Sequence, residues 1–553
     1  MQEEAQHRQS ESPEKVPEHH SDVNQVSAKH NDEGAELHGA LPPSEADIRS
    51  EKVRAASAQK SDANWLDRWG PARRWKSYKE FQRREDRGPA LYRERDPTEN
   101  ATGKLPEHEG VELPAVWVVE LYTPSTVGGL LKGIGDLGWK HGRSGSNDLA
   151  KWMSDVREGR QAGWTSLGLV SSPTDPLLMR ERTATLPQGV KAALPILMSL
   201  TPSLTAFMVV FLLDGDTASS LQVPLREEFQ TITRPDPLFR PWHIVRHVLM
   251  NGELRLGYSI HQPDSLRREA VRSLVQRIEG DCVRWVRDRL PGAFSSLPDA
   301  KNPTAILLVT EKVQPLSNAA RSIKAFHGLA IDRDYDAWES DEWPGARLVL
   351  PRSWDDEGSR MVFACRRHDA FPDSAGYHDI TSNWTIAQRA DDLIQGLLSR
   401  WAITCLLDSY HQVLSNLRDR TALNRKYRTI RDLKALRALS STALYDISAS
   451  AQEIFEFVES DVFYSHNVME MSYAHDRLGG KRLLLNGLKS AQNRRARQLQ
   501  RDAALLQSTL ANSNNLTQTI SNIRIQRLVV FLTLISIGIA LWALWISLKS
   551  ATS

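Results

Sequence analysis

Residues 528–548 read LVVFLTLISIGIALWALWISL, a run of 21 residues that carries no charged side chain. At about 1.5 Å per residue, a helix of this length crosses a bilayer core of about 30 Å. Arg524 and Arg527 stand directly before the run, whereas Lys549 is the one basic residue after it. Because basic residues are retained on the cytoplasmic side, the sequence predicts a single-pass protein of the cell membrane with its large N-terminal part in the cytoplasm.

A stripe of polar and small residues continues from the preceding segment into this run. Its members recur at alternating intervals of four and three residues, which places them on one face of a slightly supercoiled helix. The members nearest to the membrane are Asn522, Gln526, Thr533, Ser536, Ala540, Ala543 and Ser547. Small residues favour close packing between membrane helices, whereas polar groups favour a water-filled pore. Both interpretations stay open, and both indicate a homo-oligomer.

The composition indicates a reducing compartment and gives no sign of nucleic-acid binding. The chain has 553 residues, of which 41% are hydrophobic, enough for two to four structural units with buried cores. Its 70 basic and 68 acidic residues nearly cancel, so we expect no nucleic-acid binding through bulk electrostatics. Cys282, Cys365 and Cys405 lie far apart and form no CxxC pair, which predicts buried thiols in a reducing compartment.

The N-terminal two thirds of the chain divide into four parts. Residues 1–62 contain no aromatic side chain and are rich in Glu, Ser, His and Pro, which predicts a disordered tail. Residues 63–112 mix tryptophan with dense charge, and we expect an extended arm there. Strand and helix patterns alternate over residues 113–215 and over residues 216–382. We interpret these two segments as the two parts of an α+β head.

Several elements of the head can be placed by their hydrophobic pattern. The first part is expected to contain strands over 115–122 and 164–170, with helices over 125–137 and 147–161 between them. The second part is expected to contain a helix over 265–290 and strands over 305–309, 346–350 and 361–365. These strands would complete the same sheet or form a second one.

A second uncharged run, residues 192–213, also has the length of a membrane span. It contains two prolines and several hydroxyl side chains, so we interpret it as two buried strands over 194–200 and 204–213. Thr201-Pro202-Ser203 would form the turn between them. A second transmembrane span is the alternative.

Long helical patterns follow the head. Over residues 383–527, hydrophobic side chains recur every three or four residues, the spacing of a helix with one apolar face. Gly479-Gly480 interrupts this pattern, and no proline stands after Pro372 to end the helix that leads to residues 528–548. The predicted fold is therefore an α+β cytosolic head, a long α-helical, coiled-coil-like stalk and one C-terminal transmembrane helix.

Motifs of common enzymes and cofactor sites give no support for catalysis. Gly133-Ile134-Gly135-Asp136-Leu137-Gly138 matches GxGxxG, but it lies inside a predicted helix, and we expect Gly138 to cap that helix. His243 and His247 share a helix face without a third metal ligand. No GxSxG and no GxxxxGK[ST] pattern occurs. We therefore identify no cofactor and do not expect an enzyme, although an enzyme without a recognisable motif remains an alternative.

An acidic loop is the best candidate for a metal site. Asp332, Asp334 and Asp336 stand at alternate positions, like the first ligands of a calcium-binding loop. Ala337 occupies the place of the required glycine, and Trp343 the place of the bidentate glutamate. A divalent cation is the ligand that this loop would take, and an acidic loop without an ion is the alternative.

From Leu484 to Leu548, the stalk and the span resemble those of the CorA-type divalent-cation channels. The resemblance implies a cytosolic α+β domain, a stalk helix that continues as the pore-lining span, and a pentamer. The Gly-Met-Asn motif and the second span of that family do not follow Leu548. We expect a membrane-anchored oligomer whose head binds or senses an unidentified cytosolic ligand, with a CorA-like ion conduit as one interpretation. A non-conducting scaffold or signalling protein is the alternative.

Overall fold

The structure is a computed structural model, and it describes ten segments of the chain. These are residues 92–139, 148–173, 182–235, 258–297, 299–351, 359–370, 382–423, 444–458, 468–474 and 481–552. All of them belong to the one unit that comprises Glu80–His247 and Gly252–Ser553. The predicted disordered tail, the pair His243 and His247 and the Gly479-Gly480 break lie outside the described residues.

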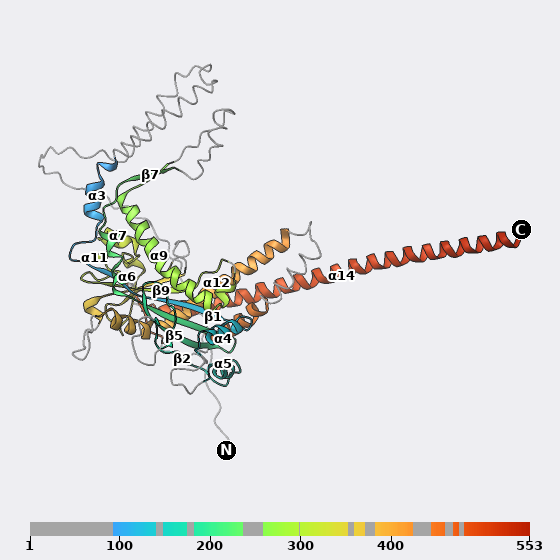
Figure 1. Cartoon of the computed structure of the whole chain (residues 1–553), viewed down its shortest axis with the longest axis horizontal. Helices are drawn as coiled ribbons and strands as arrows, with labels where there is room; N and C mark the ends of the chain where they lie inside the picture. The colour runs from blue at the N-terminus through green and yellow to red at the C-terminus, as the bar shows by residue number, and fades with distance from the viewer. Residues whose placement is uncertain are drawn as a thin grey trace, which may run out of the picture. The chain divides into compact units, whose positions relative to one another are not determined.

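One mixed sheet of 11 strands organises the described residues (Figure 1). The strand order is β13-β10-β11-β12-β9-β1-β6-β5-β3-β4, and β2 pairs with β5. The long strands are β1 (Val111–Tyr122), β5 (Val190–Thr201), β6 (Leu204–Leu213), β9 (Thr304–Thr310) and β12 (Arg360–Arg366). The short strands are β2 (Trp164–Ser166), β3 (Val170–Ser171), β4 (Arg182–Thr183), β10 (Trp338–Glu339), β11 (Arg347–Val349) and β13 (Ser472–Tyr473). A separate pair consists of β7 (Ile232–Pro235) and β8 (Tyr258–His261). Strands from both predicted parts of the head therefore share one sheet.

The centre of the sheet is formed by β1, which is antiparallel to β6 on one side and to β9 on the other. β9 and β12 are parallel, and Thr304 pairs with Arg360, so the two strands begin side by side. β1 and β6 are buried along nearly their whole length and have almost continuous apolar sequences. Such sequences are typical of strands that are covered on both faces.

A hydrophobic core lies on each face of this sheet. Trp117 and Val119 of β1 face a core that includes α12 (Asn383–Leu423), the helix at 444–458 and the first part of α14 (Leu484–Thr552). Val116 and Val118 face the other core, which includes α9 (Pro263–Arg289). This alternation follows from the two-residue period of a strand. The sheet therefore separates α9 from the C-terminal helices.

Shorter helices complete the head. They are α3 (Asp96–Gly103), α4 (Val127–Asp136), α5 (Leu149–Arg157), α6 (Gly215–Ser219), α7 (Gln222–Arg226), α10 (Ala293–Ser296) and α11 (Asn318–Arg321). Three short 3-10 helices are η2 (Lys324–Gly328), η3 (Asp334–Asp336) and η4 (Arg367–Ala370). Within the predicted arm, α3 is a helix that packs against α9.

The second uncharged run forms strands. β5 and β6 pair antiparallel over their whole length, and Thr201 pairs with Leu204 across the turn. Pro202 and Ser203 therefore form the connection, where proline presets the backbone of a tight turn. The interpretation of residues 192–213 as two strands is confirmed, and the alternative of a second helical span is wrong.

The end of α4 explains the GxGxxG pattern. Gly138 has φ +72°, and its N–H donates to the carbonyl of Gly135, while the N–H of Trp139 donates to the carbonyl of Ile134. These two bonds define a Schellman motif, in which a residue with positive φ ends the helix. Gly138 is thus a helix cap, as predicted.

Two predictions of strands need correction. Residues 164–170 form two strands, β2 and β3, because Gly168 between them has φ +87° and interrupts the extended backbone. A helical stalk was predicted over residues 383–527, but β13 lies within that range and pairs with β10. Its two residues are too short a segment to show a period of two in the sequence.

The three thiols are free, and the prediction of buried cysteines is confirmed for Cys282 and Cys365. Burial raises the pKa of Cys365 to about 12, so this thiol is protonated at neutral pH. Cys405 is half-buried.

Candidate functional site

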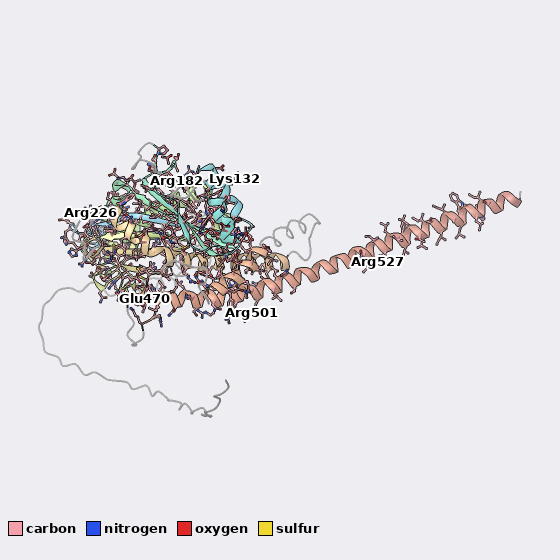
Figure 2. The ribbon with its side chains drawn as sticks, turned by 90° about the horizontal axis from the view of Figure 1, so that it is seen from below. Lys132, Arg182, Arg226, Glu470, Arg501 and Arg527 are labelled. Atoms are coloured by element: carbon pink, nitrogen blue, oxygen red, sulfur yellow. The ribbon has the colours of Figure 1, made fainter. Side chains whose placement is uncertain are left out.

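The C-terminal part of α14 has the properties of a membrane-spanning helix. Among the described residues, the segment Ile525–Ser547 is the candidate span, with a mean hydropathy of 2.5 and none of it buried within the chain. Its large apolar side chains are exposed, and those of Phe531 and Trp542 are more than half exposed. Figure 2 shows this part of α14 extending away from the packed head, beyond the labelled residue Arg527. A helix of this length and composition is long and apolar enough to cross a bilayer.

The predicted stripe lies on this exposed part of the helix. Asn522, Gln526, Thr533, Ser536, Ala540, Ala543 and Ser547 are all exposed in the single chain. The hydroxyl of Thr533 donates to the carbonyl of Val529 at 2.8 Å, and that of Ser547 donates to the carbonyl of Ala543 at 3.0 Å. These hydroxyls are satisfied by their own helix, so they fit a packed helix interface as well as a water-filled pore.

The N-terminal part of the same helix packs into the head. Its buried positions recur every three or four residues and are Leu484, Leu488, Gln492, Ala496, Leu499, Ala503 and Leu506. The Gln492 side chain donates from Nε2 to the carbonyl of Arg400 at 2.5 Å and to the Thr404 hydroxyl at 3.1 Å. Arg495 forms an ion pair with Asp408 at 3.1 Å. These contacts join α14 to α12 through a buried amide and an ion pair at the rim.

The described side chains of the acidic loop do not form a compact cluster. Asp332 lies 3.7 Å from the Nε2 atom of His327, whereas Asp334 and Asp336 belong to the 3-10 turn η3. Glu339, farther along the loop, pairs with Arg347 at 3.2 Å. No group of three or more His, Cys, Asp or Glu side chains with metal-binding geometry is found among the described side chains, which do not include that of Asp334. A divalent cation at this loop stays a prediction.

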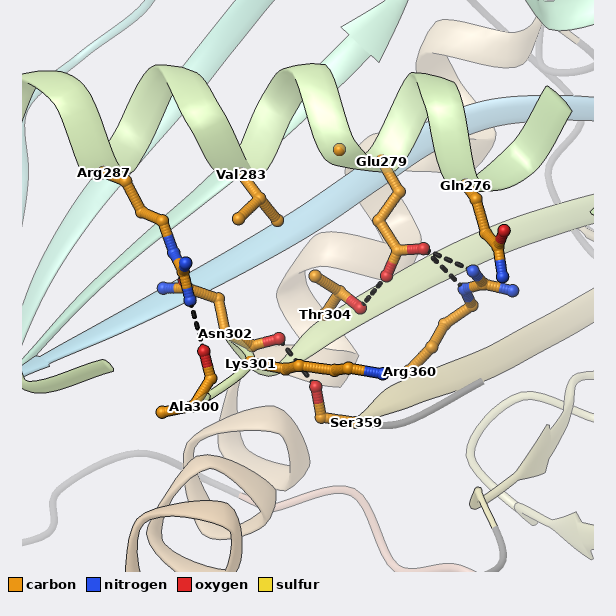
Figure 3. Close-up of a pocket in the computed structure, with 11 residues that line it drawn as sticks. Gln276, Glu279, Val283, Arg287, Ala300, Lys301, Asn302, Thr304, Ser359 and Arg360 are labelled. Atoms are coloured by element: carbon orange, nitrogen blue, oxygen red, sulfur yellow. Dashed lines mark hydrogen bonds and ion pairs between the residues drawn. The ribbon is translucent and has the colours of Figure 1, made fainter. Parts of the chain in front are cut away.

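A pocket that the sequence did not predict lies between α9 and the first residues of β9 and β12. Its volume is about 330 Å³, and we call it the α9 pocket. It is lined by Gln276, Glu279, Gly280, Val283, Arg287, Ala300, Lys301, Asn302, Thr304, Ser359 and Arg360. The residues from α9 are spaced so that they share one helix face. Figure 3 shows Arg287 and Glu279 descending from that face toward the strands.

A buried ion pair closes one side of the pocket. Glu279 accepts hydrogen bonds from Arg360 at 2.8 Å (Nε) and 2.5 Å (Nη2), and the side chains of Arg360 and Glu279 are 6% and 14% exposed. The Thr304 hydroxyl donates to the other carboxylate oxygen of Glu279. Because β9 and β12 are parallel and in register, Thr304 and Arg360 reach Glu279 together. The Glu279 charge is thus fully engaged within the wall of the pocket.

A hydrogen-bond network around Arg287 forms the other side of the α9 pocket. Arg287 donates from Nε to the Asn302 side-chain oxygen at 2.6 Å and from Nη2 to the carbonyl of Ala300 at 2.5 Å. The Asn302 amide donates in turn to Glu120 at 3.0 Å. Arg287 is therefore held by neutral oxygens, and it reaches the Glu120 carboxylate only through Asn302.

Glu120 itself is a fully buried carboxylate on β1. It accepts hydrogen bonds from the N–H groups of Leu121 and Phe294 and from the side chains of Ser295 and Asn302, at 2.6 to 3.1 Å. Burial raises the pKa of this carboxyl, and the four hydrogen bonds oppose that shift. A group with so many donors is held in one orientation, and it orients Asn302 at the pocket wall.

The lining of the pocket is basic. Three positive side chains, Arg287, Lys301 and Arg360, face one negative side chain, Glu279. Lys301 is exposed and makes no hydrogen bond or ion pair with the described part of the chain. In Figure 3 the Lys301 side chain extends between Arg287 and Arg360. The arrangement can bind an anion.

The chain was compared with protein-family models, with curated proteins and with solved structures, and none of them matches it.

Proposed function

We propose that this protein is a C-terminally membrane-anchored oligomer with a cytosolic head that senses or binds a ligand. The observation that carries the proposal is the continuity of α14, which runs as one helix from Leu484 to Thr552. Its first part is packed into the head, and its segment Ile525–Ser547 is apolar and exposed. An apolar surface of this size marks a site that contacts a membrane or another protein.

The orientation and the assembly follow from the residues on α14. Arg524 and Arg527, at the end of the candidate span that adjoins the head, favour a cytoplasmic head by the positive-inside rule. The stripe from Asn522 to Ser547 offers small and polar groups for contact with other copies of the same helix. In the proposed oligomer, the part of α14 between the head and the span forms the coiled-coil-like stalk.

Membrane extraction tests the anchor. The full chain should stay in the membrane pellet after alkaline carbonate treatment, and the variant lacking residues 525–553 should move to the soluble fraction. Deletion of residues 1–62 is the control and should leave the chain in the pellet. If the C-terminal deletion stayed in the pellet, or if the full chain were extracted, α14 would not be the anchor.

The mass of the detergent-solubilised protein tests the oligomer. Light scattering, corrected for bound detergent, should give a multiple of the 62.3 kDa chain. The paired substitutions Ala540→Leu and Ala543→Leu should reduce that multiple, because larger side chains prevent close helix contact. Leu534→Ile, on the opposite face of the helix, is the control. A monomeric full-length protein would contradict the assembly.

A CorA-like ion conduit is the second candidate function. The specific observation in its favour is that α14 is uninterrupted between Asn522 and Ser536. The amides at the start of the span and the hydroxyls farther along it therefore share one helix face. Purified protein in liposomes should then carry divalent cations, and Thr533→Leu with Ser536→Leu should abolish the flux while the oligomer keeps its mass. Absence of flux with the unmodified protein would eliminate the conduit and leave the anchored sensor.

A further inference from the structure

We propose that the α9 pocket binds a small phosphate monoester. The inference rests on the proposed function in one respect, since it names the chemical class of the ligand that the cytosolic head would sense. It rests on the geometry of the pocket for everything else.

Charge is the first argument. The lining carries three cationic groups and one carboxylate, and that carboxylate is already engaged by Arg360 and Thr304. Arg287 donates to an amide oxygen and a carbonyl, so no carboxylate of the described residues neutralises it. Two positive charges, those of Arg287 and Lys301, are thus left for an anion. Arginine and lysine are the side chains that proteins use most for phosphate groups.

Preorganisation is the second argument. Arg287 is held by Asn302, whose amide is in turn fixed by the buried Glu120 and by the carbonyl of Val119 at 3.0 Å. On the opposite wall, Arg360 is fixed by two bonds to Glu279. A ligand that meets cations already held in place loses less side-chain entropy on binding. Their remaining N–H groups can therefore bind an oxyanion at low cost.

Size is the third argument. A volume of about 330 Å³ is at the lower end of the range of about 300 to 1,000 Å³ that is usual for small-molecule pockets. It exceeds the roughly 30 Å³ of one water molecule about tenfold, so a phosphate group alone does not fill it. Val283 and Ala300 offer apolar surface for the organic part of a monoester.

Gly280 provides a way to close the pocket without disturbing the fold. An added Cβ at this position of α9 meets no atom within 4 Å, because it points into open space. Gly280→Leu should therefore fill the pocket, and it should not weaken α9, since glycine is a poor residue in a helix interior. A loss of binding in this variant would locate the ligand in the pocket.

Calorimetric titration of the full chain in neutral detergent tests the proposal. Glycerol 3-phosphate is the soluble monoester, inorganic phosphate is the minimal probe, and chloride at equal ionic strength is the reference. Glycerol 3-phosphate should bind, and Arg287→Gln and Lys301→Gln should each weaken it at least tenfold. Gly280→Leu should abolish binding. Lys132→Gln, an exposed residue of α4 labelled in Figure 2, is the matched control and should bind like the unmodified chain.

A lipid headgroup carries the same chemistry, so a second arm separates the two sources. The thermal midpoint is compared in phosphatidylcholine nanodiscs with and without phosphatidic acid. A rise that Gly280→Leu removes would support binding of the monoester group from lipid, whereas a response to glycerol 3-phosphate alone supports a soluble metabolite. The proposal is overturned if neither probe binds, or if Lys301→Gln and Gly280→Leu bind as tightly as the unmodified chain. The calorimetric result does not depend on whether α14 is the membrane anchor, so its failure is distinguishable from a failure of the proposed function.

Discussion

Trp117 of the central strand and Asp391 of α12 are joined by a buried hydrogen bond, in which the indole Nε1–H donates to the carboxylate at 2.7 Å. Gln395, one turn farther along α12, donates to the second carboxylate oxygen at 2.9 Å. Burial raises the pKa of Asp391 to about 7, and these two bonds oppose the rise. A carboxyl group in the core of the head thus changes its charge near neutral pH.

This raised pKa makes stability depend on pH. The pKa of Asp391 is about 7 in the folded state, against the ordinary value of 3.8 for the unfolded state. Between these two pH values, the folded chain binds more protons than the unfolded chain. The contribution of this carboxyl group to stability is complete below the lower value and is lost as pH rises to the upper one. Asp391→Asn keeps a neutral group at all pH values. Between pH 5 and pH 8, its stability relative to the unmodified chain should rise by about 2 to 3 kcal/mol.

Thermal unfolding followed by tryptophan fluorescence at the two pH values measures this difference. Asp419→Asn on the same helix is the control, because Asp419 is largely exposed. The Gln395 amide can rotate to accept from the new asparagine, so the variant keeps its hydrogen bonds. A stability difference that is the same at pH 5 and pH 8 would contradict the raised pKa.

Glu109 should be essential for joining β1 to the end of β9. Its buried carboxylate accepts hydrogen bonds from the backbone N–H groups of Gly110, Glu311, Lys312 and Val313, at 2.8 to 3.2 Å. Glu109→Ala leaves the N–H groups of Gly110, Lys312 and Val313 without this acceptor, at about 1 to 3 kcal/mol each when water does not enter. The N–H of Glu311 keeps a hydrogen bond to the carbonyl of Gly110. We expect a loss of at least about 3 kcal/mol in denaturant unfolding.

Glu107→Ala provides the comparison, since Glu107 is exposed two residues away and should cost less than about 0.5 kcal/mol. Equal stabilities of the two variants would show that solvent replaces the Glu109 carboxylate. Glu109→Gln keeps one acceptor oxygen and should fall between them.

Two glycines of α4 should respond in opposite directions. A Cβ added at Gly133 would lie 2.1 Å from the carbonyl oxygen of Arg289, whereas one added at Gly135 meets nothing within 4 Å. Gly133→Ala should force α4 away from the end of α9 and cost about 1 to 3 kcal/mol. Gly135→Ala should stabilise the helix by roughly 0.5 to 1 kcal/mol. Circular dichroism during thermal unfolding distinguishes them, and a stabilising Gly133→Ala would refute this packing.

The buried ion pair in the wall of the α9 pocket should contribute far more to stability than an exposed ion pair on the same helix. Glu279→Gln leaves the buried Arg360 guanidinium without its countercharge, and we expect a loss of about 3 kcal/mol. Asp281→Asn breaks the pair with Arg284 on the same helix, where the side chains are 36% and 67% exposed. That change should cost less than about 1 kcal/mol. Comparable losses in denaturant unfolding would mean that the buried pair is solvated.

Local pattern was sufficient to predict the long elements. The apolar runs of β1 and of the β5–β6 hairpin, and the helical periods of α9 and α12, are properties of a few consecutive residues. The β13–β10 pair was not predictable, because it joins segments more than 130 residues apart through two residues each. Such pairing depends on tertiary packing, which a single sequence does not display.

The α9 pocket escaped prediction for the same reason. Glu279, Thr304 and Arg360 are neighbours only because β12 pairs with β9 in parallel and α9 crosses their first residues. The sequence does contain one signal, which is the shared helix face of Glu279, Val283 and Arg287. In the acidic loop, by contrast, a regular sequence pattern is present without a site. The spacing of Asp332, Asp334 and Asp336 does not bring their described side chains into one cluster.

Among the described side chains of α14, Leu506 is the last buried one, and the candidate span begins at Ile525. The helix between these two residues acts as a spacer. Its 18 residues measure about 27 Å at 1.5 Å per residue. Upright on a bilayer, this spacer exceeds the Debye length of about 8 Å at physiological salt more than threefold. The charge of the lipid headgroups would then have little electrostatic effect on the head. Soluble molecules could also reach the side of the head that faces the membrane.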